Sequence, residues 1–413
     1  MTLTAHGAHD TSSPIVFDPY DYGFQEDPYP VYTRLRGEDP LHHNDQHDFW
    51  VLSRHADVAA ALKDDTTFSN SMGVSVDKSA WGPDAHKVMS FLAMDPPRQQ
   101  RLRALVSKGF TPRRVRDLSP RIQALTDAYL DKALPAPGES GTLDWIPELA
   151  GKLPMDVISE MMGVPEPDRD EVRRLADLVV HREDGVYDVP EAGMAAALEL
   201  IGYYSDLLEQ RKRQPTEDLT SALLHAAIDG DRLDDHEIIA FLFLTVVAGN
   251  ETTTKLLGNA LFHLSAHPAQ KQAVLGDLDL VAPWIEETLR FDTSSQMLAR
   301  YLKKDLALHG KVSPAGSKLV LVLGSANRDE RVFTRAGDYD VHRDKDEVSQ
   351  LISFGGGRHF CLGAHLARLE ARIALEELVR RVRSFDVDRE AAVRVHSTNV
   401  RGFASLPIEV EMR

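Results

Sequence analysis

The chain has 413 residues, with 47 Lys or Arg against 64 Asp or Glu, so its formal net charge is −17. This balance disfavours nucleic-acid binding, because phosphate recognition draws most of its affinity from Lys and Arg. The 43% hydrophobic content is typical of a globular protein and disfavours disorder, and the single cysteine, Cys361, excludes an internal disulfide framework.

The first 15 residues are polar and lack the pattern of a secretory signal, so we interpret residues 1–15 as a flexible tail. Helical periodicity dominates the remainder. The expected helices are residues 57–64, 97–109, 120–133, 149–162, 190–212, 236–266, 268–275, 283–290 and 362–383. Strands are expected at 49–52, 319–323 and 408–411. The pattern predicts a mainly α fold with small β-sheets. Without repeats or flexible linkers, residues 16–413 are expected to form one domain.

The most apolar stretch, residues 238–249, is shorter than the roughly 20 residues that a membrane span needs. We therefore expect a buried helix there, no membrane anchor and a cytoplasmic location.

Positive charge is concentrated between Arg98 and Arg116, where seven basic residues occur with no acidic one. Such a run indicates an acidic partner or an anionic cofactor, and the alternative is an ordinary solvated helix face.

Cys361 follows three consecutive glycines and directly precedes the expected helix 362–383. A thiol at a helix N-terminus is favoured as the thiolate, which is a good metal ligand. An inert buried cysteine and a nucleophilic cysteine are the alternatives. The glycines, with Arg358 and His359 beside the thiol, argue against an inert position, and no His/Asn arrangement supports a nucleophile.

The segment around this cysteine resembles the haem-binding signature of the cytochrome P450 superfamily. The matching positions are Phe354, Gly355, Gly357, His359, Cys361 and Gly363. The resemblance implies a P450 fold in which Cys361 is the axial thiolate ligand of the iron of haem b, Phe354, Gly355 and Gly363 shape the cofactor loop, and His359 contacts a propionate.

A second match to the family lies in the expected helix 236–266, at Ala248, Gly249, Glu251 and Thr252. The Thr252 hydroxyl can bond the carbonyl of Ala248, four residues earlier. The resemblance implies that Ala248 and Gly249 leave room for O2, while Glu251 and Thr252 deliver protons as catalytic residues.

Further matches concern structure and the propionates. Glu287 and Arg290 match a buried structural ion pair of the family, expected to be completed by residues 327–329. By the same resemblance, Arg300 and Arg103 contact the propionates. Gln99 stands where the family has a histidine, so that contact is expected to be weaker.

His263 and His267 have a spacing that can bind zinc, but no third ligand is evident. No Gly-rich nucleotide loop is present, so electrons must come from another protein. We expect an acidic ferredoxin, supplied by NAD(P)H through its reductase, to dock on the basic face. That face comprises Arg98, Arg101, Lys108, Arg113, Arg114 and Arg358, with Arg368 and Arg372 nearby.

The resemblance implies a monomeric haem-thiolate monooxygenase that uses O2 to hydroxylate or epoxidise a hydrophobic small molecule such as a lipid, terpenoid, steroid or polyketide. A non-turnover sensor and a peroxide-driven peroxygenase are the alternatives, and the Glu251–Thr252 pair disfavours both. The expected pocket residues are mainly apolar. They are Phe241, Leu244, Thr245, Ala248, Ser295, Gln296, Met297, Val400 and Phe403.

Overall fold

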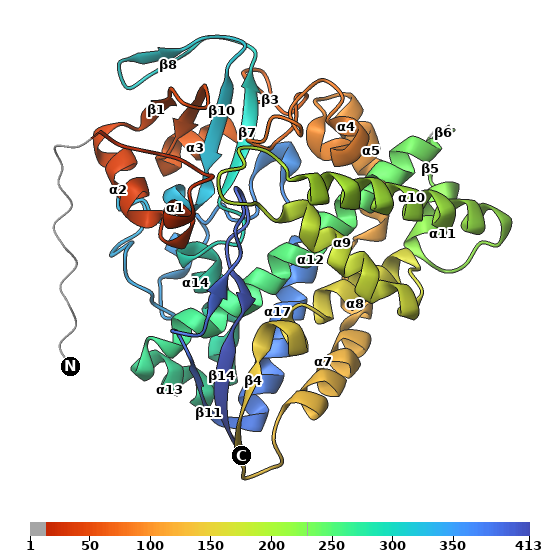
Figure 1. Cartoon of the computed structure of the whole chain (residues 1–413), viewed down its shortest axis with the longest axis vertical. Helices are drawn as coiled ribbons and strands as arrows, with labels where there is room; N and C mark the ends of the chain where they lie inside the picture. Colours follow the sequence, from red (N-terminus) through yellow and green to blue (C-terminus); the bar gives the residue numbers. More distant parts are fainter. Residues whose placement is uncertain (1–13, 229) are drawn as a thin grey trace.

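A single long helix, α12 (Asp235–Ser265), runs through the middle of the molecule and contacts most other large helices (Figure 1). The computed structural model describes residues 14–228 and 230–413. The helix begins at a capping box, in which the Asp234 carboxylate accepts from the Glu237 N–H at 2.8 Å and the Glu237 carboxylate accepts from the Asp234 N–H at 3.2 Å. The predicted boundary at residue 236 is thus correct to within one residue.

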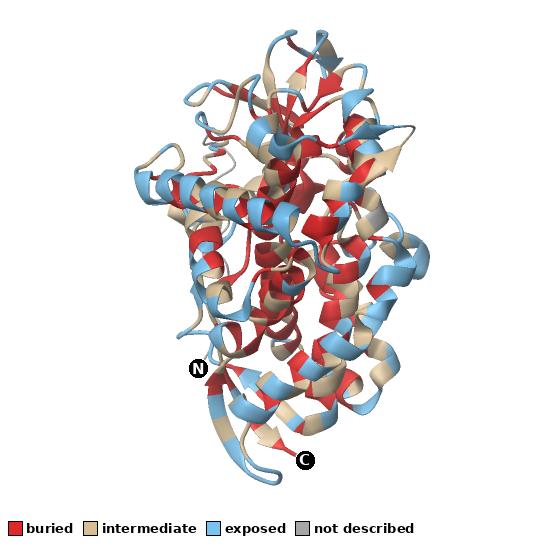
Figure 2. Ribbon diagram, turned by 90° about the vertical axis from the view of Figure 1, so that its right-hand side faces the viewer, coloured by how far each residue is buried: buried red, intermediate tan, exposed pale blue. Residues whose placement is uncertain are grey.

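The other large helices surround α12, and most of them are in direct contact with it. They are α7 (Ser119–Ala133), α8 (Leu153–Met162), α9 (Arg169–Val180), α10 (Glu191–Arg213), α11 (Leu219–His225), α13 (Pro268–Gly276), α14 (Val281–Phe291) and α17 (Ala364–Arg381). A π-helical turn, Ile146–Ala150, precedes α8. Figure 2 shows the buried residues concentrated along the central helices.

Small sheets lie at the two ends of the helical body (Figure 1). One has the order β1 (Leu41–Asn44), β2 (Phe49–Leu52), β10 (Lys318–Val322), β7 (Met297–Leu302), β3 (Phe68–Ser69), and only its β2–β10 pair is parallel. The other has the antiparallel order β11 (Val382–Val387), β14 (Pro407–Met412), β4 (Ser140–Asp144). Two-stranded pairs are β5 (Ala227–Ile228) with β6 (Asp231–Arg232), β8 (Leu306–Leu308) with β9 (Lys311–Ser313), and β12 (Val393–Arg394) with β13 (Phe403–Ser405). The prediction of a mainly α fold with small sheets is confirmed.

Shorter helices connect these layers. They are α1 (Tyr22–Glu26), α2 (Tyr29–Glu38), α3 (His55–Ala61), α4 (His86–Met89), α5 (Arg98–Val106), α6 (Pro112–Asp117), α15 (Leu323–Ala326) and α16 (Lys345–Val348). Short 3-10 turns cover Ser90–Ala93, Ser107–Gly109, Glu166–Asp168, Leu278–Leu280 and Gly357–His359.

The expected helices and strands are present, with two instructive differences. The helix predicted over residues 362–383 ends at Arg381, because Val382 begins strand β11 and pairs with Met412. Helix α9 was missed, since only Val172, Leu175 and Ala176 form its buried stripe. Most of the expected tail, residues 1–13, lies outside the described residues, whereas Ile15 packs against a hydrophobic cluster.

Two other expectations can be compared with the fold. No helix in the described ranges is long and apolar enough to cross a membrane.

The two candidate zinc ligands are engaged elsewhere: His263 Nε2 lies 2.8 Å from Asp292 Oδ2, and His267 Nδ1 lies 2.8 Å from the His263 carbonyl oxygen. Within residues 14–228 and 230–413, no group of three or more His, Cys, Asp or Glu side chains could hold a metal ion.

A buried ionic triad fixes α14 to the segment that follows β10. The Arg290 guanidinium donates two hydrogen bonds to the Glu287 carboxylate, at 2.7 and 2.8 Å, and Arg343 donates a third at 3.0 Å. Arg290 also donates to the carbonyls of Asn327, Ala336 and Asp338 at 2.9–3.1 Å.

This arrangement corrects part of the sequence-based expectation. Asn327 does complete the pair, but the second arginine is Arg343. The Arg328 guanidinium instead lies between the rings of Tyr29 and Phe291, 3.4 and 3.5 Å from their centroids.

Replacing Glu287 by Gln should destabilise the fold strongly, because Arg290 then remains fully buried without a carboxylate partner. We expect the free energy of unfolding, measured by urea denaturation, to fall by about 3–5 kcal/mol. Glu171→Gln is the matched control, since the Glu171–Arg174 pair has the same spacing but both side chains are 55% exposed. Equal effects of the two substitutions would contradict the assigned role.

Candidate functional site

The Cys361 loop is a tight turn that ends at the N-terminus of α17. The Cys361 N–H donates to the Phe354 carbonyl at 2.9 Å and closes the loop. Gly355 and Gly357 adopt φ of +70° and +58°, which favour glycine. At Gly357 there is also no space, because an added Cβ would lie 2.5 Å from the carbonyl oxygen of Leu62. Gly363 is the N-cap residue of α17.

The thiol of Cys361 is crowded by protein on one side and exposed on the other. Burial raises the pKa of the thiol. Backbone N–H groups of Gly363 and Ala364 and the positive charges of Arg103 and Arg368 act in the opposite direction. Since a bound metal ion deprotonates a coordinating thiol outright, this sulfur is suited to be a metal ligand held by backbone donors.

Arg300 is a buried cation without a direct ion-pair partner in the described part of the chain, and the charge of Asp95 only partly offsets its burial. The residue is 2% exposed on strand β7, and its guanidinium donates a hydrogen bond to the carbonyl of the adjacent Ala299 at 2.8 Å. No carboxylate of the described chain forms an ion pair with it, and burial lowers its pKa to about 10. An unpaired buried guanidinium is costly, so this position is suited to an anionic group supplied from outside the chain.

His359 lies in the field of the same arginines. Its Nδ1 is buried and has no hydrogen-bond partner among the described residues. Burial, together with the charges of Arg300 and Arg103, lowers the pKa of His359 to about 4. The structure therefore brings Arg300, Arg103 and His359 close enough to interact electrostatically, although 256 residues separate Arg103 from His359 in the sequence.

Two side chains of helix α5 donate hydrogen bonds to the backbone of the Cys361 loop. The Gln99 side chain is fully buried, and its Nε2 donates to the Arg358 carbonyl at 2.9 Å. Arg103 Nη2 donates to the Phe360 carbonyl at 2.6 Å. Gln99 was predicted as a weakened contact to an anionic group. In the structure its amide is instead used to hold the loop backbone, while its Oε1 has no partner among the described residues.

One face of α12 remains open within an otherwise buried helix. Leu244, Ala248 and Thr252 recur every four residues, and Ala248 is exposed while its two neighbours in this row are partly exposed. The Thr252 hydroxyl donates to the Ala248 carbonyl at 2.9 Å, as the spacing predicts. Gly249 lies against α8, where an added Cβ would be 3.5 Å from Ile158.

Glu251 lies on the flank of α12 and is 4% exposed. Its carboxylate forms an ion pair with Lys255, with 3.0 Å between Oε2 and Nζ. It also lines the same pocket as Asp177 of α9, a residue that the sequence analysis missed. No local spacing could have indicated this proximity, because 74 residues separate the two carboxyl groups.

The expected substrate-pocket residues do not all lie on the open face. Phe241 packs against Phe91 and Phe110, and Phe403 packs against Phe262 at a centroid distance of 4.6 Å. The Thr245 hydroxyl donates to the Phe241 carbonyl at 2.6 Å.

The segment around β7 is divided between two environments. Met297 belongs to a hydrophobic cluster with Tyr32, and Gln296 accepts from the Tyr32 hydroxyl at 3.2 Å. We therefore assign Gln296 and Met297 to packing rather than to the pocket. Ser295 and Val400 form a β-bridge, which brings these two segments together.

The basic run is only partly available to a partner. Arg101 is paired with Asp231 and Glu237, and Arg358 pairs with Asp65 at 2.6 Å. The side chain of Lys108 lies outside the described residues. Arg98, Arg113, Arg114 and Arg116 are exposed and have no ion-pair partner in the described part of the chain. Beside α6, a groove of about 390 Å³ is lined by Val115, Arg116, His365, Arg368 and Arg372, among others.

The loop geometry generates a prediction at two adjacent glycines. Gly357→Ala would introduce a Cβ into a positive-φ position against Leu62, which we expect to cost about 1–3 kcal/mol and to lower the melting temperature. Gly356→Ala is the control, since Gly356 has φ of −165° and an added Cβ would lie 3.4 Å from Leu62 Cβ. A melting temperature lowered equally in both variants would refute this account.

The donor set fits a haem: one thiol with an open side, an uncompensated buried Arg300 and an unpartnered His359 Nδ1 beside it, and the open face of α12. These features match a group that combines a thiolate-binding metal with anionic substituents.

Comparisons with known proteins agree with this fit. A family model described as Cytochrome P450 matches residues 193–411. A Mycobacterium tuberculosis protein named as a cytochrome P450 123 is 55% identical over 399 residues, covering 97% of this chain and 98% of the relative. Vitamin D(3) 25-hydroxylase of Pseudonocardia autotrophica is 36% identical and spans 100% of both chains. The solved structure of CYP109Q5 from Chondromyces apiculatus has a TM-score of 0.84 at 34% identity, covering 96% of this chain and 98% of that one. The chain therefore belongs to the cytochrome P450 family and is an oxidoreductase of the monooxygenase type.

Proposed function

We propose that this monooxygenase inserts one oxygen atom of O2 into a hydrophobic small molecule, by hydroxylation or epoxidation, with electrons from NAD(P)H delivered through a ferredoxin. For a hydroxylation, substrate R–H, O2, two electrons and two protons give R–OH and water. The observation that carries the proposal is the exposed Cys361 thiol, toward which the backbone N–H groups of Gly363 and Ala364 and the charge of Arg103 are directed.

Cys361 would hold the iron of haem b, and Arg300, with His359 and Arg103 nearby, would bind its carboxylates. When bound, the haem supplies the redox-active metal at which O2 is reduced. The protein's own contribution is to hold the thiolate with N–H donors and to neutralise the carboxylates in a buried position.

The second contribution of the chain is control of protons on α12. The Thr252 hydroxyl donates its hydrogen to the Ala248 carbonyl, so its oxygen is free to accept from a water molecule on the open face. Glu251, the preceding residue, is the nearest carboxyl group in the sequence and the proposed source of protons for that water. These roles disfavour a sensor without turnover, which would need no proton delivery.

The substrate is proposed to be a steroid-like or other polycyclic or macrocyclic apolar molecule. Leu244 and Ala248 offer apolar surface on the open face, and the Thr245 hydroxyl is already satisfied within its own helix. No residue of this row carries a charge that would require a charged substrate. The relative named for hydroxylating vitamin D(3), a large apolar molecule, supports this class.

The ferredoxin is proposed to dock near α6 and the start of α17. Arg113, Arg114 and Arg116 of α6 are exposed and unpaired in the described part of the chain, Arg116 lines the groove, and α17 begins three residues after Cys361. A positive patch on an acidic protein favours an acidic partner and a salt-sensitive encounter.

Reduced protein reconstituted with haem and exposed to CO should show the strongly red-shifted Soret band of a thiolate-ligated iron. Cys361→Ser should lose that band, because serine cannot supply a thiolate. A wild-type spectrum without the shift would overturn the assignment of Cys361, and with it the proposed function.

Arg300→Met should weaken retention of the haem, because the substitution preserves length but removes the buried charge that faces the carboxylates. Charged hydrogen bonds contribute about 1.5–3 kcal/mol, so haem loss to an excess of acceptor protein should accelerate by roughly 10- to 100-fold. Arg114→Met, at an exposed position on α6, is the control and should leave the rate unchanged. Equal rates for wild type and Arg300→Met would exclude the carboxylate contact.

A further inference from the structure

A buried carboxylate at the end of α14 joins four elements of the fold. Asp292 is the C-cap residue of α14, and its side chain is fully buried. Its Oδ1 accepts from the Tyr29 hydroxyl of α2 at 2.7 Å and from Arg401 Nε at 2.8 Å. Its Oδ2 lies 2.8 Å from Nε2 of His263 on α12. The fourth element is the segment between β12 and β13, residues 395–402, which we call the C-terminal turn.

Arg401 holds the C-terminal turn to the rest of the molecule. Its Nη2 donates to the Glu26 carbonyl of α1 at 3.0 Å, and its Nη1 donates to the Gln25 carbonyl. Its own carbonyl accepts from the Asn259 amide of α12 at 3.1 Å, and the same amide donates to the Asp292 carbonyl at 2.9 Å. One residue of the turn is therefore bonded to α1, α12 and the end of α14.

The turn also pairs with the residues that lead into β7. The Arg401 N–H donates to the Ser294 carbonyl at 2.8 Å, and the Gln296 N–H donates to the Asn399 carbonyl at 2.8 Å. These two hydrogen bonds lie on either side of the bridge that Val400 forms. Because Asp292 holds Arg401, the carboxylate also sets the place of the backbone that carries Val400.

A glycine lets the same turn lie directly on α12. An added Cβ at Gly402 would lie 2.5 Å from the Cβ of Lys255. The Lys255 ammonium donates to the carbonyl of Phe403, just beyond the turn, at 3.2 Å. Lys255 lies about one helical turn after Glu251. The helix side of the turn is thus fixed next to the part of α12 that carries the proposed catalytic residues.

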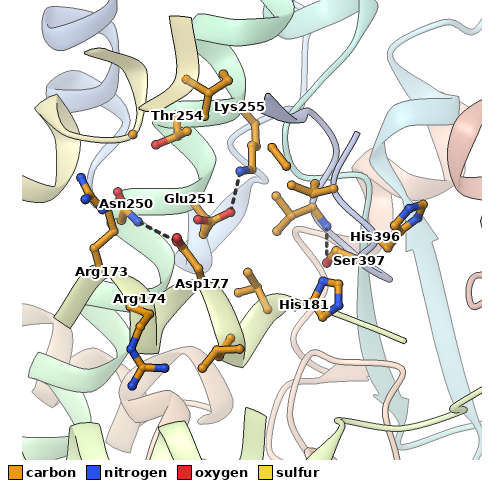
Figure 3. A pocket seen from close by; sticks show the side chains of 17 residues that line it. Arg173, Arg174, Asp177, His181, Asn250, Glu251, Thr254, Lys255, His396 and Ser397 are labelled. Atoms are coloured by element: carbon orange, nitrogen blue, oxygen red, sulfur yellow. Dashed lines mark hydrogen bonds and ion pairs between the residues drawn. The ribbon is translucent and has the colours of Figure 1, made fainter. Parts of the chain in front are cut away.

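The other side of the turn borders a pocket of about 330 Å³ between α9, α12 and the turn (Figure 3). Val400 and Ser397 line this pocket from the turn, and Glu251 lines it from α12. Across the bridge from Val400, Ser295 is partly exposed, whereas residues 292–294 before it are buried. The turn therefore presents Val400 at a boundary between the packed interior and open space beside α12.

The charges of the cluster favour a strong and permanent attachment. Burial raises the pKa of Asp292, but Arg401, His263 and Arg394 outweigh it, so this pKa lies well below its ordinary value. Burial lowers the pKa of His263 to about 4. Near neutral pH the carboxylate is ionised and the imidazole is neutral, so Nε2–H of His263 donates to Asp292. Hydrogen bonds to an ionised acceptor are roughly twice as strong as neutral ones.

We propose that Asp292 is a positioning residue for the substrate, because through Arg401 it holds the C-terminal turn at the place where Val400 contacts the apolar body of the bound molecule. The proposal deepens the proposed function, since it rests on an apolar substrate that lies beside α12. Asp292 is itself fully buried and has no contact with the pocket, so it acts only through the turn.

Hydrogen exchange of the haem-loaded protein tests whether Asp292 holds the turn. Tyr29→Phe removes one hydrogen bond to the carboxylate, and Asp292→Asn removes its charge. Loss of one hydrogen bond should speed exchange of the Gln296 and Arg401 amides roughly tenfold, and Asp292→Asn should speed it further. Tyr203→Phe is the matched control, because the Tyr203 hydroxyl donates to the Asp168 carboxylate at 2.8 Å elsewhere in the molecule. It should leave these two amides at the wild-type rate.

Ligand binding tests the effect on the substrate region. Imidazole ligates the haem iron alone, whereas clotrimazole is an imidazole that carries three aromatic rings and also contacts the surrounding apolar surface. The ratio of their dissociation constants, measured by the shift of the Soret band, reports that surface. Val400→Ala should weaken clotrimazole relative to imidazole on the order of tenfold, because two methyl groups are lost. Asp292→Asn and Tyr29→Phe should change the ratio in the same direction, and Tyr203→Phe should not.

The outcomes separate the levels of the proposal. Wild-type exchange rates in Tyr29→Phe and Asp292→Asn would refute the attachment of the turn, and if Asp292→Asn does not fold, Tyr29→Phe decides. Faster exchange with an unchanged ratio would refute the role toward the substrate, and so would a wild-type ratio in Val400→Ala. If the reduced wild type with CO lacks the red-shifted band, the proposed function fails, whereas the exchange rates still decide whether Asp292 holds the turn.

Discussion

The buried triad of Glu287, Arg290 and Arg343 is the interaction on which the position of the cysteine loop depends. Arg290 donates to the carbonyl of Asn327, and the Asn327 side chain in turn bonds the Ile352 N–H at 2.9 Å and the Ser353 hydroxyl at 2.8 Å. The Gly355 N–H then donates to the Ile352 carbonyl at 2.8 Å, and the carbonyl of the preceding Phe354 accepts from the Cys361 N–H at 2.9 Å. Hydrogen bonds and short stretches of backbone thus connect the salt-bridged helix α14 to the Cys361 N–H, which donates to the Phe354 carbonyl. Because Arg290, Asn327 and Ile352 are buried, the loss of one of them leaves its partner unsatisfied, which makes this part of the connection cooperative.

Charge is used differently on the two sides of the site. In the triad, each guanidinium is matched by a carboxylate and by backbone carbonyls within the protein. At Arg300 no carboxylate of the described chain forms an ion pair, so the protein alone carries much of the desolvation cost of this cation, and in the proposed function the matching charge comes from the cofactor. Binding of a group with carboxylates removes that cost, and the affinity for the group therefore includes energy that the fold itself has stored at Arg300.

The sequence predicted the parts of this site that are local in the chain and missed those that depend on distant contacts. The turn around Cys361 and the Ala248–Thr252 bond follow from spacings of a few residues, so they could be predicted. Arg343 and Asp177 could not, since they reach Glu287 and Glu251 only through the packing of separate elements. Gln99 was expected to make at most a weakened contact to the cofactor, and its bond to the Arg358 carbonyl could not be predicted, because a single position cannot reveal which backbone carbonyl an amide faces. Helix α9 was overlooked for a related reason. Its few buried apolar residues are too short a pattern to predict a helix, and the helix is stabilised by packing against α10 and α12, which are distant in the sequence.

The amide of Gln99 has a consequence for the robustness of the site. A histidine at this position would change between one and two N–H donors as it titrates near neutrality, and the loop carbonyl of Arg358 would experience that change. The amide offers the same donor at every proton concentration. Together with the permanently charged Arg103, it gives the Cys361 loop two supporting hydrogen bonds, to the Arg358 and Phe360 carbonyls, that do not vary with pH near neutrality.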